Sequence, residues 1–214
     1  MFFRRKPAPV SWIIVFLGNP GSRYENTRHN AGFMTADGIE KNAGLRINRL
    51  KFNALTNTAE IGGHRVFLMK PQTFMNLSGQ SVSAVASFFK IKIDSILVVH
   101  DELELSLGTL SLKFGGGLGG HNGLRSMKAS FGSADFWRLR IGIGRPDSRL
   151  PGEGGPEGSG EGIVDWVLSD FSTREAEELN SVLDFASELL MDALAGSPES
   201  LLPEWAKKKV LIDA

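Results

Sequence analysis

Residues 12–22 read WIIVFLGNPGS, and this stretch decides the fold class. Its first six residues form a continuous apolar run, which is typical of a strand buried on both faces of a sheet. The glycines and the proline that follow predict a sharp turn at the end of that strand. Sheets of this kind are covered by helices on both sides. The stretch therefore indicates an α/β fold, with short polar residues gathered where the first strand ends.

Strand and helix patterns alternate along the rest of the chain. Two runs on either side of Gly62 and Gly63 predict a β-hairpin. Ser172 and Glu175 form a capping-box pattern at the start of a long amphipathic segment. Further helices are predicted over 27–43 and 78–90, and further strands over 95–100, 109–114 and 138–144. This order predicts a mixed sheet with helices on both faces.

The length of 214 residues suggests one domain. We expect residues 1–11 to be a basic N-terminal extension, residues 12–200 to be the folded domain, and residues 201–214 to be a C-terminal tail. Within the domain, PGEGGPEGSGEG (151–162) cannot bury apolar area, so a flexible Gly/Pro/Glu loop is predicted there.

Charge is distributed unevenly although the net charge is zero. Residues 1–149 carry 20 Lys and Arg against 10 Asp and Glu, whereas residues 150–214 carry 4 against 14. This asymmetry suggests a polyanionic partner for the first part, although a basic face without a function would look the same. The chain has no cysteine, which excludes disulfides and thiolate nucleophiles and fits a reducing, cytoplasmic compartment. No apolar run approaches membrane-spanning length.

Three polar clusters follow strands or precede helices. The ends of strands are where open α/β sheets bind their ligands, so we expect the clusters to meet. The first holds Asn19, Tyr24, His29 and Asn30; the second is KPQTFMN (70–76), ending at Asn76; the third combines HDELEL (100–105), containing Asp101, with GGGLGGHNG (115–123), containing His121 and Asn122.

The residue types in these clusters suit hydrolysis. A histidine can take a proton from water near neutral pH, and a carboxylate on its other ring nitrogen fixes its tautomer. Asparagine offers amide donors for a developing oxyanion. No serine lies in a G-x-S-x-G turn and no metal-ligand spacing is present, so we expect activated water, no metal and no cofactor. The glycines of 115–120 match a dinucleotide fingerprint only weakly, because the first strand is followed by GNPGS instead.

Each of these residues also has a purely structural interpretation. Asn76, Ser78 and Asn122 could serve as helix caps. His29 could be a structural histidine near a helix start, and Asp101 could be an acceptor in a turn. The recurrence of polar residues after several strands, with a histidine and an acid among them, favours a site.

Four blocks together resemble the bacterial peptidyl-tRNA hydrolase family. They are LGNPGSRYENTRHNAG, KPQTFMNLSGQSV, HDELELSLGTLSLKFGGGLGGHNGLRSM and FWRLRIGIGRP, in the family's order and at similar spacing. The resemblance covers roughly residues 13–200. It implies a single-domain α/β/α sandwich around a mixed, mostly parallel sheet. It also implies a monomeric, metal-independent hydrolase that cleaves the ester between a peptide and the 3′ end of tRNA, recycling tRNA from prematurely released chains.

The resemblance assigns roles to the polar clusters. His29 would be the general base and Asp101 the acid that supports it. Asn19 and Asn76 would hold the peptide backbone, and Asn19 would help to distinguish blocked from free aminoacyl-tRNA. Asn122 would bind substrate and stabilise the oxyanion or orient the water. The cleft near the terminal nucleotide and the peptide would be lined by Tyr24, Phe74, Met75 and His121.

Two cations are expected to contact tRNA. The resemblance places Lys113 and Arg140 at phosphates of the acceptor end. Strand alternation puts both on the polar faces of their strands, in the basic part of the chain. Phe16 stands where the family usually has glycine, and it would either repack the core or crowd the floor of the cleft. A different function is also considered: some organellar relatives have become non-catalytic RNA-binding splicing partners on the same fold.

Overall fold

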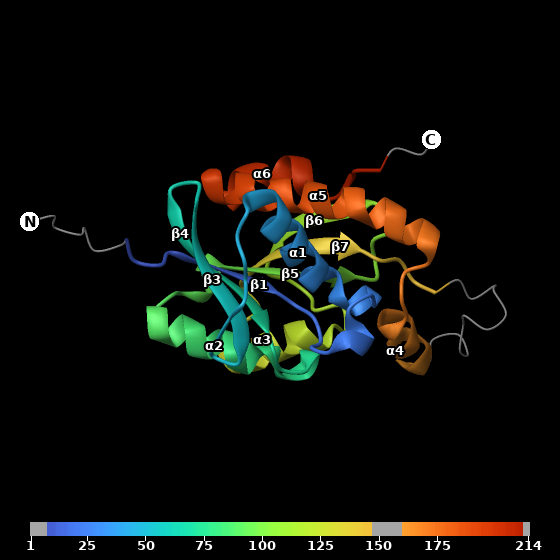
Figure 1. The fold of residues 1–214 in the computed structure, drawn as a ribbon, viewed down its shortest axis with the longest axis horizontal. Coiled ribbons are helices and arrows are strands. Elements are labelled where there is room, and N and C mark those ends of the chain that lie inside the picture. The colour runs from blue at the N-terminus through green and yellow to red at the C-terminus, as the bar shows by residue number, and fades with distance from the viewer. Residues whose placement is uncertain (1–7, 147–159, 212–214) are drawn as a thin grey trace, which may run out of the picture.

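The computed structural model describes residues 8–146 and 160–211 (Figure 1). Its eight-stranded sheet has the order β2-β3-β4-β1-β5-β7-β6-β8. The strands are β1 (Trp12–Phe16), β2 (Arg49–Lys51), β3 (Ala54–Ile61), β4 (His64–Pro71), β5 (Ile96–Glu102), β6 (Thr109–Phe114), β7 (Trp137–Gly142) and β8 (Lys208–Lys209).

The sheet is mixed, as predicted, but it is not mostly parallel. Strands β4, β1, β5 and β7 are parallel and occupy the centre. The pairs β2–β3, β3–β4, β6–β7 and β6–β8 are antiparallel. The predicted hairpin at Gly62 and Gly63 accounts for one outer pair, because both glycines adopt the positive φ that a tight hairpin turn requires.

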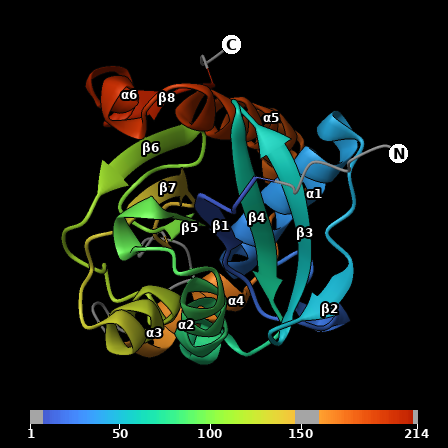
Figure 2. The same ribbon diagram turned by 90° about the vertical axis from the view of Figure 1, so that its left-hand side faces the viewer.

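Helices cover both faces of the sheet, which gives the expected α/β/α sandwich (Figures 1 and 2). One layer contains α1 (Ala31–Ala43), α5 (Thr173–Ala195) and α6 (Pro198–Trp205), and the other contains α2 (Ser78–Phe89) and α3 (Asn122–Phe131). Helix α4 (Gly160–Leu168) lies at one end of the molecule (Figure 1). Short 3₁₀ turns precede or follow the strands: η1 (Ser22–Tyr24), η2 (Arg28–Asn30), η3 (Met75–Leu77) and η4 (Ile93–Ser95).

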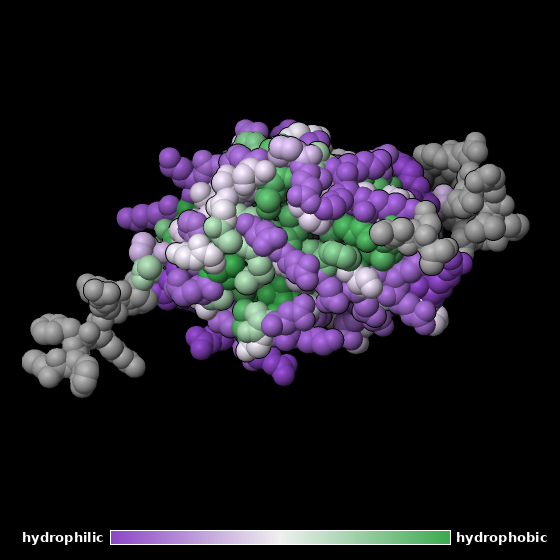
Figure 3. Space-filling model, turned by 90° about the horizontal axis from the view of Figure 1, so that it is seen from above, coloured by the Kyte–Doolittle hydropathy of each residue, from purple (hydrophilic) through white to green (hydrophobic). Residues whose placement is uncertain are grey.

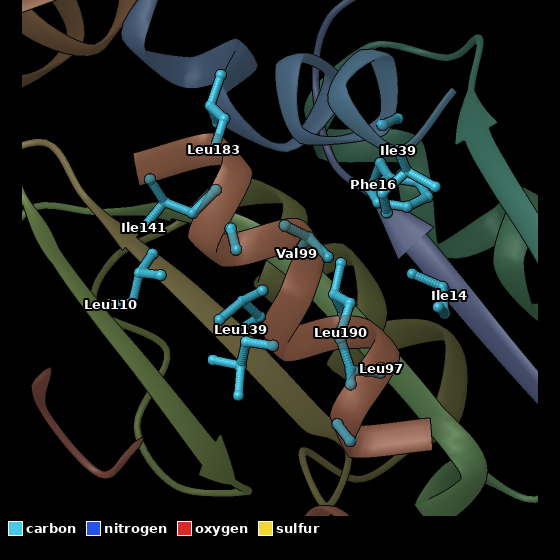
Figure 4. Close-up of a cluster of buried hydrophobic side chains, with 14 of the residues drawn as sticks. Ile14, Phe16, Ile39, Leu97, Val99, Leu110, Leu139, Ile141, Leu183 and Leu190 are labelled. Atoms are coloured by element: carbon cyan, nitrogen blue, oxygen red, sulfur yellow. The ribbon is translucent and has the colours of Figure 1, made fainter. Parts of the chain in front are cut away.

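Two hydrophobic cores flank the sheet. Along β5, Leu97 and Val99 pack towards α1 and α5, whereas Ile96 and Val98 pack towards α2 and α3. This alternation follows from the two-residue period of a strand. Phe16 is fully buried in the first core together with Ile39 (Figure 4). Phe16 therefore repacks the core.

Several predicted boundaries differ in the structure. Residues 160–162, expected in the flexible loop, form the first turn of α4, while residues 151–159 lie outside the described part. Residues 201–205, expected in a tail, complete α6, and β8 then adds an edge strand beside β6. Residues 1–7 of the expected extension are also outside the described part, and Ser11 donates a backbone hydrogen bond to Arg65. The sequence pattern did not predict helix α6 and strand β8, because both depend on tertiary contacts.

The surface over α5 and α6 is mostly hydrophilic with separate apolar patches (Figure 3). Among the described residues, every helix is too short or too polar to cross a lipid bilayer.

Candidate active site

The polar clusters meet at the carboxyl ends of the parallel strands, as predicted. A cavity of about 310 Å³ lies there. Its polar wall comes from η2, β5 and the start of α3, and Ile163 and Val167 of α4 line it from another side. The polar lining includes His29, His100, Asp101, His121 and Asn122.

Asp101 holds two imidazoles with a single carboxylate oxygen. His29 Nδ1 lies 2.8 Å and His121 Nε2 lies 3.0 Å from Asp101 Oδ1. The two rings lie 4.8 Å apart between centroids and are tilted by 47°. All three residues are largely buried: the side chains of His29, His121 and Asp101 are 9%, 7% and 2% exposed. Few water molecules can compete for these contacts.

The hydrogen bonds fix the tautomer of each histidine. His121 Nδ1 accepts the backbone N–H groups of Gly123 and Leu124, so it caps α3 and carries its proton on Nε2. His29 donates Nδ1–H to the same carboxylate. His29 Nε2 makes no hydrogen bond to any residue that the structure describes, so its lone pair is available in the cavity. This is the arrangement that a general base requires.

The charges of the site raise the pKa of His29 and lower the pKa of Asp101. Burial lowers the pKa of His29, but the charge of Asp101 and its hydrogen bond outweigh burial and raise that pKa above the ordinary value. Burial would raise the pKa of Asp101, but the charges of His29 and His121 and their hydrogen bonds hold it well below its usual range. Asp101 is therefore ionised and can stabilise an imidazolium at His29.

His100 lines the same cavity as an uncharged imidazole. Its Nδ1 donates to the backbone oxygen of Asp101 over 2.7 Å, and its ring lies 5.0 Å from that of His121 in an edge-to-face arrangement. Burial, followed by the charge of His121, holds the pKa of His100 well below its ordinary value. Its role is to support the backbone beside the acid without adding a charge.

The cluster of His29, Asp101 and His121 has ligand atoms within 4.8 Å of one another, as a metal site would. The cap of α3 argues against that use. A metal on His121 Nε2 would need the ring proton on Nδ1, where the N–H groups of Gly123 and Leu124 already point. The donor set therefore fits a hydrogen-bonded base and acid better than a metal ion.

The position of His29 is set by its neighbours in the chain. A Cβ on Gly32 would overlap the carbonyl oxygens of Leu17 and Val99, so only glycine lets the start of α1 approach β1 and β5 so closely. On the other side, Arg28 is buried, and its Nη2 lies 2.9 and 2.8 Å from the two carboxylate oxygens of Glu175. Its guanidinium also lies 3.8 Å from the ring centroid of Trp166.

A second set of contacts ties Asn19 to the site. Asn30 Oδ1 accepts the backbone N–H of Asn19 over 2.8 Å, and Asn19 Oδ1 accepts the N–H of Met75 over 2.9 Å. Met75 in turn lies against the start of α3, because a Cβ on Gly123 would come within 2.6 Å of its sulfur. The first, second and third polar clusters therefore form one continuous site. Asn19 Nδ2 makes no hydrogen bond to a described residue and remains a donor.

The helix-cap interpretation is wrong for both Asn76 and Asn122. Asn76 lies within η3, and helix α2 begins after Leu77 without a side-chain cap. The N-cap of α3 is His121, while Asn122 is the first helical residue. Both asparagines are exposed, as is Phe74, so their amides are available to a ligand.

The remaining predicted residues lie around the cavity rather than in its polar wall. Tyr24 is half-buried in η1, and its backbone oxygen accepts from Thr27, two residues before His29. Lys113 and Arg140 share one face of the β6–β7 pair. Arg140 is engaged, with Nη1 3.5 Å from Glu102 and Nη2 2.6 Å from Ser111. Lys113 forms no ion pair with a residue of the described ranges.

Sequence reasoning missed Arg28, His100 and the cover supplied by α4. Arg28 adjoins His29 in the first polar cluster, but its partner Glu175 was visible only as part of a capping box. No spacing rule links residues that far apart. His100 adjoins Asp101 in the third cluster, and its position in a strand gave no signal of the contact with His121.

Comparisons with known proteins agree with one another. A family model described as peptidyl-tRNA hydrolase matches residues 13–211. A relative from Trichlorobacter lovleyi, named peptidyl-tRNA hydrolase, is 48% identical over 190 residues, which are 88% of this chain and 92% of the relative. One from Lacticaseibacillus casei with the same name is 41% identical over 87% of this chain and 94% of its own. A crystal structure of peptidyl-tRNA hydrolase from Acinetobacter baumannii superposes with a TM-score of 0.78 at 37% identity, covering 92% of both chains.

Proposed function

The chain belongs to the peptidyl-tRNA hydrolase family, and we propose how its site performs that hydrolysis. The protein is an enzyme that cleaves the ester between a peptide and the 3′ end of tRNA, and so recycles tRNA from prematurely released chains. We assign its catalytic machinery to His29, Asp101, Asn19 and Asn122. The observation that carries the assignment is the buried His29–Asp101 pair, which leaves the His29 Nε2 lone pair available in the cavity.

In the first step His29 Nε2 takes a proton from water, and the water oxygen bonds to the ester carbonyl carbon. Asp101 stabilises the imidazolium that forms, because its carboxylate is ionised and buried beside the ring. The tetrahedral intermediate then collapses, the bond between carbon and the 3′ oxygen breaks, and the imidazolium returns its proton to that oxygen. No acyl-enzyme is needed, and His29 carries the proton throughout.

The asparagines divide the remaining work. Asn122 lines the cavity beside His121, where its amide can donate to the developing oxyanion. Asn19 has its oxygen committed to Met75, so it can only donate, and a peptide carbonyl is its natural acceptor. Asn76 is exposed, so both its amide oxygen and its amide nitrogen can reach a peptide backbone. Apolar and aromatic contacts to the peptide and terminal nucleotide are assigned to Tyr24, Phe74 and Met75.

His121 has a role that differs from the expected contact with substrate. It fixes both the start of α3 and the carboxylate of Asp101, which makes it a positioning residue for the base. Lys113 and Arg140 are assigned to phosphates of the tRNA acceptor end, on the shared face of β6 and β7. The enzyme is proposed to act as a monomer in the cytoplasm.

The decisive experiment replaces the base. His29→Ala should lower turnover of peptidyl-tRNA by about 10²- to 10⁴-fold while leaving the fold and tRNA affinity near those of the unmodified protein. His64→Ala is the matched control, because His64 lies in the β3–β4 hairpin and bonds to Ser11 outside the site. A fall of less than about threefold for His29→Ala would overturn the assignment.

The non-catalytic alternative, an RNA-binding splicing partner, has no support from the relatives, which carry the name of the hydrolase. Multiple turnover by the unmodified chain would exclude it directly.

A further inference from the structure

A groove separate from the active site lies along the edge of the sheet. It has a volume of about 570 Å³ and is bordered by the edge strand β2, by β3 and β4, and by the C-terminal end of α2. These elements lie at one end of the molecule, while α4, which lines the catalytic cavity, lies at the other (Figure 1). We call it the edge groove and define it by Arg49, Lys51, Arg65, Phe88 and Lys90, all of which line it.

The charge of the edge groove has one sign. Arg49, Lys51, Arg65 and Lys90 line it, and no carboxylate is among the described residues that form its walls. Over the whole chain, cations and acids are equal in number, so four cations without an acid are a local concentration. Such a surface attracts a polyanion.

The edge groove also exposes an aromatic ring. Phe88 is 60% exposed, although it is a phenylalanine at the end of a helix. It is held in place by Phe52 and Phe89, whose ring centroids lie 5.3 and 4.9 Å away. A rigid, exposed ring between cations is what proteins use to stack an unpaired base while the cations hold the phosphates.

Lys51 occupies one face of that ring in the free protein. Its Nζ lies 4.8 Å from the centroid of Phe88 and 5.0 Å from that of Phe52. An exposed cation–π contact is weaker than the stacking of a base on an aromatic ring. A nucleotide can therefore displace Lys51 from the ring, and the displaced ammonium remains close enough to bind the adjoining phosphate.

A turn and a helix end with positive φ angles shape the edge groove. Phe52, Asn53 and Lys90 are the non-glycine residues of the described ranges that have positive φ, at 55°, 52° and 57°. Glycine would avoid the cost that a side chain meets in this conformation. Phe52 and Asn53 form the two-residue turn between β2 and β3, where a tight hairpin needs positive φ at both positions, and Lys90 is the left-handed C-cap of α2. The turn places the ring of Phe52 against Phe88, and the cap places Lys90 in the wall of the edge groove.

A simpler explanation covers only part of these observations. Edge strands often carry cations that prevent pairing with other chains, and Arg49 and Lys51 of β2 fit that role. It does not account for the exposed ring of Phe88 or for the further cations Arg65 and Lys90 in the same walls, although Arg65 Nη1 also donates to the backbone oxygen of Ala8 over 2.9 Å.

We propose that the edge groove binds unpaired RNA, with a base stacked on Phe88 and phosphates held by Arg49, Lys51, Arg65 and Lys90. This site goes beyond hydrolysis and does not depend on His29. It would let the enzyme hold a single-stranded RNA segment at one end while the other end acts on an ester.

The test measures fluorescence anisotropy of a labelled, short single-stranded oligouridylate with the full chain at several salt concentrations. Phe88→Ala should weaken binding by roughly 5- to 150-fold, which corresponds to one stacked base. Phe185→Ala is the matched control, because Phe185 is 39% exposed on α5 and away from the edge groove. It should leave the affinity unchanged.

The cations are tested by the salt dependence. In a variant with alanine at both Arg49 and Lys51, the slope of log affinity against log salt concentration should shrink by about 0.7 for each phosphate that is no longer neutralised. The control removes Lys41 and Arg174, two exposed cations of α1 and α5, and should preserve the slope. His29→Ala should bind the oligouridylate normally, which separates this site from catalysis.

Three results would overturn the proposal. The first is an equal loss of affinity in the Phe88 and Phe185 variants. The second is competition by inorganic polyphosphate as effective as that by RNA, since it would mean that charge alone is recognised. The third is preferential binding of an acidic peptide, since it would make the edge groove a protein-docking surface. Phe88→Ala should turn over peptidyl-tRNA at the unmodified rate while it loses affinity for the oligouridylate. The test of the edge groove is therefore independent of the hydrolase assignment.

Discussion

Asp101 is the residue on which the site depends, because one of its oxygens accepts from two histidines. Each of these hydrogen bonds lowers the cost of burying the carboxylate charge, and each imidazole is oriented by the bond it donates. His121 uses its other nitrogen for the α3 backbone, whereas the other nitrogen of His29 makes no hydrogen bond to a described residue. The second nitrogen therefore distinguishes the two histidines: that of His121 holds the start of α3, and that of His29 is left to the proposed role of base.

The pH dependence of the rate follows from the raised pKa of His29. A base works only when unprotonated, so kcat/KM should fall as the pH drops through a pKa above the ordinary histidine value of about 6.5. Asp101→Asn removes the charge that raises this pKa. The inflection should then move to lower pH while the maximal rate falls. A pH–rate profile of both proteins measures the shift, and an inflection that stays in place would show that Asp101 does not act on His29.

Replacing Asn122 and replacing Asn76 should change different kinetic parameters. If Asn122 donates to the oxyanion, Asn122→Ala should lower kcat by about 10²-fold with little change in KM. If Asn76 holds the peptide in the ground state, Asn76→Ala should mainly raise KM. Steady-state kinetics on one blocked aminoacyl-tRNA separate the two effects. Equal kinetic losses in both variants would contradict the division of labour.

At the scale of elements, the 3₁₀ turn η2 connects His29, the proposed base, with α4 and α5. Arg28 leads away from the cavity into the junction between α4 and α5, where it meets Trp166, Phe171 and Glu175. Its backbone N–H also donates to Ser169, and Thr27 bridges to Asp170. This set of contacts, which we call the Arg28 clamp, fixes both the cover of the cavity and the residue beside the base.

Breaking the Arg28 clamp should reduce stability and rate together. Arg28→Lys keeps the charge but removes the stacking on Trp166 and the second guanidinium nitrogen, which donates to Ser169 Oγ and to the backbone oxygen of Asp170. The free energy of unfolding should therefore fall by about 1–3 kcal/mol. The rate should fall severalfold in kcat because η2 loosens. Arg174→Lys is the matched control, since Arg174 is a 91% exposed arginine paired with Glu178 in the same helix. Denaturant unfolding and steady-state kinetics provide the readouts; equal behaviour of the two variants would remove the Arg28 clamp from the mechanism.

Local sequence patterns predicted the elements that near neighbours encode, but not the elements that depend on contacts between distant parts of the chain. The apolar run at 12–17, the hairpin at Gly62 and Gly63, and the Ser172–Glu175 capping box are encoded by near neighbours, and all three are present. Helix α4 and strand β8 were missed because the first begins in a glycine-rich segment and the second consists of two residues paired to a distant strand. In the site, the pattern and the resemblance predicted that His29 meets Asp101, and the structure brings them together, whereas the contact of His121 with the same carboxylate required the fold.

Over the whole molecule, the basic first part of the chain forms strands β1 to β7, whereas α4, α5, α6 and the short edge strand β8 come from the acidic last part. The proposed phosphate ligands, Lys113 and Arg140, share a face of β6 and β7 as strand alternation predicted. Arg140 is partly neutralised by Glu102, an acid of β5 rather than of the C-terminal part. The two cations are therefore not equivalent.

Lys113→Ala should weaken tRNA binding more than Arg140→Ala does. Removing a cation that fully neutralises one phosphate should reduce the log–log salt slope by roughly 0.7 to 1, and the effect at Arg140 should be smaller because Glu102 already holds part of its charge. A minimal substrate, a blocked amino acid on a short nucleotide fragment, should be cleaved normally by both variants. Affinity for tRNA measured across a salt series tests this, and unchanged slopes in both would exclude phosphate binding by these cations.

The Arg28 clamp also bears on the order in which the chain is synthesised. Arg28 pairs with Glu175, which follows it by 147 residues in the chain. A polypeptide still emerging from the ribosome contains His29 and Asp101 long before it contains α5, the helix that carries Glu175. The enzyme should therefore acquire full activity only after α5 has been synthesised, so a copy that stops before α5, which is itself a peptidyl-tRNA, is poorly equipped to cut the ester that holds it.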